Sequence, residues 1–238
     1  FILITILNLY LNFHLILLAK NLTGYKNLLF LTSNAFVNNF YYKPRISKET
    51  LAQHSEGLIA TSACLAGELA QVLRSPTWST KDIQDAIGFY TDVFGENFYL
   101  EVQDHRSNDK EYSRLQKQLN DILIAMKIPT VITADSHYTC KEDKGLHDII
   151  MAIGLRKTLL EYTSNEEMRL PEHCYLATPK DVLEGAKAIG HEAAFYNIEG
   201  LVEKIEDFNP GVGLSRPPLF DFKNASDYKE FLDENTTS

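Results

Sequence analysis

The sequence predicts an α/β fold in which buried strands alternate with amphipathic helices. Two patterns support this prediction. Short apolar runs rich in β-branched residues are typical of buried strands, and the longer stretches between them carry apolar residues at helical spacing. A third observation is chemical, because Cys64, the Asp104/His105 pair and the Asp135/His137 pair each follow a predicted strand. In parallel α/β sheets and barrels, functional groups gather at the carboxyl ends of the strands.

Four apolar runs are predicted to be strands of a parallel sheet. They are apolar runs, and the last of them is rich in β-branched residues, as expected for buried strands. Pro129 opens the last run, a position at which a strand tolerates proline. The four runs are residues 14–19, 57–61, 98–102 and 128–132.

The helices are predicted from their spacing and their end signals. Ser79 or Thr80 offers an N-cap for a helix that ends near Phe94, and Gly95 is typical of the residue that follows a helix. Proline in the first turn supports a helix that begins at Thr178. The remaining predicted helices are residues 23–38 with Thr23 as cap, a short helix from Ser47, and residues 108–126, 141–153 and 191–205.

Length and composition fit one large globular domain of 238 residues, 45% hydrophobic and 23% charged. The formal net charge of -9 excludes a global basic field, so any DNA contact has to be local or made by another domain. The three cysteines are widely spaced and form no CxxC pair. This pattern argues against a zinc finger and for reduced thiols in a cytosolic protein.

The two ends of the sequence differ from its middle. Residues 1–19 are strongly apolar, but Asn8, Asn12 and His14 interrupt the run and no basic segment precedes it. A buried strand is therefore favoured over a signal peptide or a membrane span. The first residue is not Met, which suggests a fragment or a processed product. The tail from Gly211 is rich in Pro, Gly, Ser and charge, and is predicted to be a linker.

Asp135 and His137 form the most informative pair in the sequence. They lie two residues apart after a predicted strand, so their side chains can point to the same side. Carboxylate oxygen and imidazole nitrogen are ligands that zinc and manganese accept. The alternative is a capping Asp beside a packed His, because a D-x-H motif is short and common.

Seven strings, taken in order, resemble the PHP (polymerase and histidinol phosphatase) domain of bacterial DNA polymerase III alpha subunits. The strings are HLILLAKN (14–21), GYKNL (24–28), FYYKPRI (40–46), SACLAGE (62–68), FYLEVQDH (98–105), IPTVITADSHY (128–138) and HDII (147–150). The resemblance runs from about His14 to Ile205. Motifs kept in this order over most of the chain are highly specific.

The resemblance implies a distorted (β/α)7 barrel of the TIM-like kind, of which this chain holds part. Residues 14–207 are expected to form the partial PHP domain, after an apolar segment at residues 1–13 that does not match the family. Residues 208–238 are expected to lead toward a polymerase palm that this chain does not contain.

The resemblance also implies a cluster of metal ions at the strand ends. The matched ligand positions are His14, Cys64, Asp135 and His137, and the implied cofactor is a divalent metal, zinc or manganese. The family's other ligands include an HxH pair, which this sequence lacks. Four positions cannot build the whole cluster, so the isolated chain is expected to fold poorly and to lack useful nuclease activity.

Several further polar residues match no ligand position. Asp104 and His105 end a predicted strand, and are expected to orient the ligands or to face the substrate. His147 is expected to pack within its helix, and Cys140 and Cys174 are assigned no role.

The implied function is that of a polymerase module. The parent protein carries out DNA-directed DNA synthesis, and the PHP domain is a metal-dependent phosphoesterase of the 3′–5′ exonuclease type in some members. The alternatives are a non-catalytic structural or partner-docking module of the polymerase, and a free-standing PHP phosphatase. The implied partners are DNA, through the parent polymerase, and replisome subunits such as the sliding clamp and the proofreading exonuclease. The expected location is the cytoplasm, without membrane contact.

Overall fold

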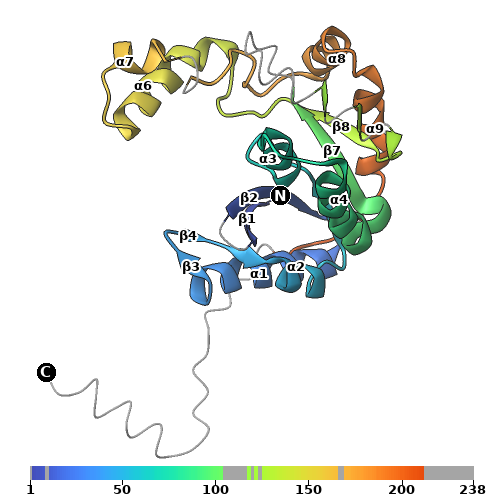
Figure 1. Cartoon of the computed structure of the whole chain (residues 1–238). Coiled ribbons are helices and arrows are strands. Elements are labelled where there is room, and N and C mark those ends of the chain that lie inside the picture. Colours follow the sequence, from blue (N-terminus) through green and yellow to red (C-terminus); the bar gives the residue numbers. More distant parts are fainter. Residues whose placement is uncertain are drawn as a thin grey trace, which may run out of the picture. The chain divides into compact units, whose positions relative to one another are not determined.

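The computed structural model describes residues 2–8, 11–103, 117, 118, 121, 122, 125–165 and 169–211. Contacts divide the chain into a unit of residues Phe1–Phe208 and a second unit of residues Asn209–Ser238. All the helices and strands given below belong to the first unit (Figure 1).

Six strands form one sheet in the order β5-β1-β2-β6-β7-β8. A separate two-stranded ribbon pairs β3 (Phe40–Tyr41) with β4 (Lys43–Pro44). The strands of the main sheet are β1 (Ile2–Asn8), β2 (Leu11–Ala19), β5 (Ile46–Ser47), β6 (Leu58–Thr61), β7 (Phe98–Gln103) and β8 (Thr130–Thr133).

The predicted parallel sheet is confirmed for β6, β7 and β8 and is wrong at β2. Strand β7 pairs in parallel with both β6 and β8. Strand β2 instead runs antiparallel to β1 and to β6. Only residues 9 and 10 separate β1 from β2, and a connection that short can join antiparallel strands only.

The α/β class is confirmed, whereas the predicted (β/α)7 barrel is not. Among the described residues the sheet has six strands, and β5 and β8 end the order without pairing with each other. The sequence pattern could not reveal this, because a barrel and an open sheet place the same apolar runs in their strands.

Helices follow most of the predicted ranges. Ser79 caps α4 in a capping box with Asp82, and Gly95 ends it with a φ of 54°. The predicted helix 108–126 lies largely outside the described residues. The helices are α1 (Leu22–Val37), α2 (Lys48–Gln53), α3 (Glu68–Arg74), α4 (Thr80–Phe94), α6 (Lys144–Gly154), α7 (Leu159–Thr163), α8 (Pro179–Ala188) and α9 (Glu192–Val202). No helix among the described residues is both long and apolar enough to cross a membrane.

Apolar side chains cover both faces of β6 and β7. Leu58 and Leu100 belong to a large cluster with side chains of α1, α3 and α4. The alternate residues Ile59 and Tyr99 belong to a second cluster, packed against Ile198 and other side chains. This two-sided burial explains the unbroken apolar runs in the sequence, and it holds the carboxyl ends of these strands in fixed positions.

The prediction that Thr23 caps α1 is wrong, because Asn21 is the cap. The Asn21 side chain accepts a hydrogen bond from the Gly24 backbone N–H at 3.0 Å. Gly24 in turn lies against Gly57, which has a φ of +72° and precedes β6. A Cβ on Gly24 would lie 1.8 Å from the Gly57 carbonyl oxygen, so this crossing requires glycine.

The substitution Gly24→Ala is expected to lower the free energy of unfolding by about 1–3 kcal/mol, because the new methyl group overlaps the Gly57 main chain. The matched control is Gly88→Ala in α4, where no atom lies within 4 Å of the new Cβ. That variant is expected to gain about 0.5–1 kcal/mol from helix propensity. Urea denaturation measures both, and equal midpoints for the two variants contradict the close approach.

Candidate metal centre

Glu101 joins the carboxyl ends of three parallel strands. Its carboxylate accepts hydrogen bonds from Thr61 Oγ1 at 2.5 Å, Thr133 Oγ1 at 2.7 Å and Gln103 Nε2 at 3.2 Å. These donors are the last residues of β6, β8 and β7. Glu101 is only 3% exposed, so each of these bonds forms away from water. The sequence analysis missed this residue, although an acidic side chain inside an apolar strand is a usable signal.

His14 and Cys64 lie together beside this edge of the sheet. The His14 Nδ1 atom is 3.6 Å from the Cys64 sulfur. His14 lies within β2, and its backbone N–H donates to the Ala66 carbonyl at 2.9 Å. The loop that carries Cys64 is tight. Gly67 lies so near the Ser62 carbonyl oxygen that an added Cβ would be only 2.2 Å from it.

Both members of this pair favour their uncharged forms. Burial lowers the pKa of His14, and the nearby Lys43 cation lowers it further. Burial raises the pKa of the Cys64 thiol, and the negative charges of Asp135 and Glu101 also raise it, against a lowering by a backbone hydrogen bond. A neutral imidazole is ready to bind a cation, whereas the thiol has to lose its proton to do so.

Asp135, His137 and Cys174 form a second group of ligand-type side chains. One ligand atom from each lies within 4.8 Å of the other two. Asp135 follows β8 with a φ of 46°, in the left-handed region. The His137 Nδ1 atom lies 2.5 Å from the Asp135 main-chain oxygen and 3.9 Å from its Oδ1. Carboxylate, imidazole and thiol donors in one place are a donor set that zinc accepts.

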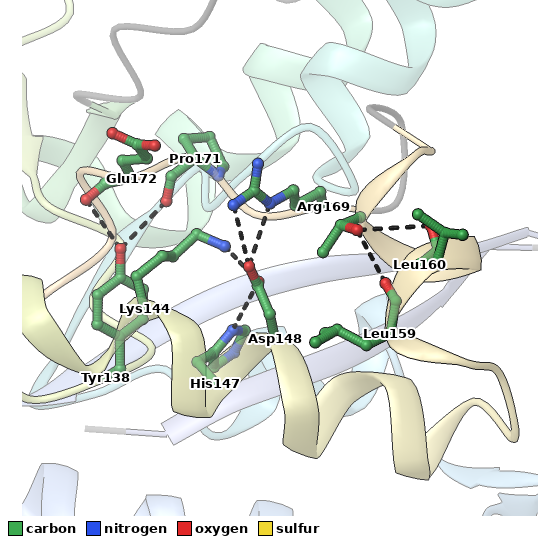
Figure 2. Close-up of polar contacts among 10 residues, drawn as sticks. Tyr138, Lys144, His147, Asp148, Leu159, Leu160, Arg169, Pro171 and Glu172 are labelled. Atoms are coloured by element: carbon green, nitrogen blue, oxygen red, sulfur yellow. Dashed lines mark hydrogen bonds and ion pairs between the residues drawn. The ribbon is translucent and has the colours of Figure 1, made fainter.

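A network of charged groups joins α6, which follows His137 in the sequence, to Arg169, which precedes Cys174 (Figure 2). Asp148 on α6 accepts a hydrogen bond from Lys144 and two from Arg169, at 3.1 Å each. The His147 ring lies 5.3 Å from the Tyr138 ring and 6.4 Å from the His137 ring, between centroids. His147 therefore packs against the site, and burial lowers its pKa.

The structure brings the four predicted ligands together as two pairs, His14 with Cys64 and Asp135 with His137. Among the described residues, the group whose ligand atoms all lie within 4.8 Å of one another holds Asp135 and His137 but neither His14 nor Cys64. Asp104 and His105, predicted to orient ligands or face substrate, lie outside the described residues. Cys174 joins the second pair.

Comparison with known proteins finds similarity to the PHP domain and to DNA polymerase III alpha subunits. Residues 7–105 match the model of the PHP domain. The chain is 41% identical over 146 residues to DNA polymerase III subunit alpha of Treponema pallidum, a match that covers 61% of this chain and 12% of the relative. It is 34% identical to that of Borreliella burgdorferi and to that of Campylobacter jejuni, over 93% and 94% of this chain. The chain spans 19% of the length of each of these two relatives.

The substitution Glu101→Ala is expected to lower the free energy of unfolding by about 2–4 kcal/mol, because three donors, two of them buried, lose a charged acceptor. As control, Glu184→Ala removes a carboxylate that is 58% exposed on α8, and is expected to change stability by less than about 0.5 kcal/mol. Chemical denaturation of both variants measures the difference. If the two variants are equally stable, Glu101 does not hold the strand ends.

Proposed function

We propose a metal-dependent phosphoesterase site for this chain, which belongs to the PHP-domain family and, within it, with the sequences of DNA polymerase III alpha subunits. The site consists of His14, Cys64, Asp135 and His137. The single observation that carries the proposal is the pairing of ligand-type side chains next to two strand ends: His14 with Cys64 after β6, and Asp135 with His137 after β8.

The donor set fits a divalent ion. The Cys64 thiol lies beside the imidazole of His14, which burial favours in its neutral form, and the charges of Asp135 and Glu101 help to raise the pKa of this thiol. A cation bound there offsets the repulsion among these negative groups and favours the thiolate. Sulfur and imidazole donors favour zinc, whereas manganese prefers oxygen ligands. We therefore infer zinc rather than manganese.

Each residue has a distinct task in this proposal. His14 and Cys64 hold the ion from β2 and from the loop after β6, and Asp135 and His137 hold it from the end of β8. The Glu101 hydrogen bonds keep the strand ends at a constant separation. When bound, the ion lowers the pKa of a coordinated water and polarises a phosphoryl oxygen. The reaction class is phosphodiester hydrolysis, of the 3′–5′ exonuclease type.

The fold, location and partners of the whole protein follow as parts of the same proposal. The distorted (β/α)7 barrel is the expected setting of the site. The relatives are named DNA polymerases, so the proposed partner is DNA. The family resemblance adds the sliding clamp, the proofreading exonuclease and a cytoplasmic location.

A second candidate function is that of a structural module of the polymerase. The observation that favours it is the Glu101 network, in which side-chain hydrogen bonds add to the main-chain pairing of β6, β7 and β8. In that case the site residues stabilise the fold and no hydrolysis takes place. The named relatives are polymerase subunits, so a free-standing phosphatase is the weaker alternative.

The substitution Asp135→Asn is expected to weaken zinc binding by at least about tenfold, because a charged ligand is lost. The matched control Asp85→Asn changes an exposed residue of α4 and is expected to bind zinc like the original chain. Equilibrium dialysis with metal analysis measures both. Equal zinc content in all three proteins removes the metal site from the proposal.

Hydrolysis of single-stranded DNA labelled at its 3′ end distinguishes the two candidate functions. Release of the label by the full-length polymerase subunit loaded with zinc, lost in Asp135→Asn and kept in Asp85→Asn, supports the phosphoesterase. Zinc binding without release of the label supports the structural module.

A further inference from the structure

We propose that Cys174 is a further metal ligand, and that it holds a divalent ion together with Asp135 and His137. This inference rests on the proposed metal site. It adds a residue that the family motifs do not supply and that lies 37 positions after His137 in the sequence.

The spacing of the donor atoms suits a shared ion. The ligand atoms of Asp135, His137 and Cys174 all lie within 4.8 Å of one another. Zinc binds nitrogen and oxygen at about 2.0–2.2 Å and sulfur at about 2.3 Å, so donors to one ion lie up to roughly 4 Å apart. The His137 side chain is 42% exposed, and a small rotation of its ring is enough to close the remaining gap.

The backbone fixes this spacing. The His137 N–H donates to the Cys174 carbonyl at 2.8 Å, and the Leu176 N–H donates to the Tyr138 carbonyl at 3.0 Å. Residues Tyr138 and Tyr175 form a parallel β-bridge, which joins the two segments side by side. The approach of Cys174 to the Asp135/His137 pair is therefore set by main-chain hydrogen bonds.

Side chains anchor the same segment just before Cys174 (Figure 2). The Tyr138 hydroxyl donates to the carbonyls of Glu172 at 2.8 Å and Pro171 at 3.3 Å. The two hydrogen bonds from Arg169 to buried Asp148 hold the segment to α6. A thiol held in this way is preorganised for binding.

The surroundings of Cys174 also differ from those of an ordinary core cysteine. Its exposure is 0%, yet it belongs to none of the apolar clusters found among the described residues. A buried thiol next to a carboxylate and an imidazole gains more from a bound cation than from packing alone. Cys140 is different, since it is exposed and its sulfur donates to Asp143 at 3.2 Å.

The test uses the whole chain loaded with Co²⁺, because each cobalt–thiolate bond adds a charge-transfer absorption band in the near ultraviolet. Both Cys64→Ser and Cys174→Ser are expected to lose about half of the band, and the combined variant all of it. Cys140→Ser is the matched control and keeps the full band. The inference is overturned if Cys174→Ser keeps the full band while Cys64→Ser loses it, and that result leaves the proposed function standing.

A second measurement leaves residue 174 unchanged, so it does not depend on how Cys174→Ser folds. In the Cys64→Ser/Cys140→Ser chain, Cys174 is the only cysteine. X-ray absorption of the zinc-loaded protein is expected to show a Zn–S distance of about 2.3 Å. A shell of nitrogen and oxygen only overturns the inference. Failure of the original chain to bind either metal overturns the proposed function together with it.

Discussion

The Glu101 carboxylate and its three hydrogen bonds are the constraint on which the rest of the site depends. One buried acidic group accepts bonds from the last residues of β6, β7 and β8, at the edge where the ligand-type residues follow. Burying a carboxylate is costly unless it is fully hydrogen-bonded, so these donors and Glu101 require one another. The polar strand ends are thereby held in one register, with Cys64 following β6 and Asp135 following β8.

The charge distribution of the site follows from this arrangement. Burial and the charges of Asp135 and Glu101 raise the pKa of the Cys64 thiol, while burial and Lys43 lower the pKa of His14. Negative groups gathered beside neutral nitrogen and sulfur donors favour a cation and disfavour an anion. A bound divalent ion would therefore stabilise the folded form, since metal affinity for a site that exists only in the folded chain adds to folding stability.

Local patterns in the sequence predicted the fold where local interactions decide it. The helix cap at Ser79 and the apolar run of β7 each depend on residues close together in the sequence, and both are found as expected. The start of α1 was missed although its cap is local, since the Asn21 side chain accepts a hydrogen bond from the Gly24 N–H only three residues on. The antiparallel β1–β2 pair was missed because the resemblance was drawn only from His14 onward, whereas the match to the PHP domain begins at residue 7.

The site shows the same division. His14, Cys64, Asp135 and His137 could be chosen from motif resemblance, and the structure groups them in pairs. Cys174 could not, because only the pairing of residues 136–138 with residues 174–176 brings it to the site. The spacing of these residues in the sequence does not predict such a pairing. Glu101 lay within the reach of sequence reasoning, since a charged residue inside a buried strand requires partners.

The most direct test of the central claim is diffraction at the zinc absorption edge from crystals of the chain grown with zinc. The account predicts an anomalous peak within about 2.0–2.3 Å of donor atoms from His14, Cys64, Asp135 and His137. A peak bound by none of these four residues, or no peak in crystals in which these four side chains are ordered, would contradict it.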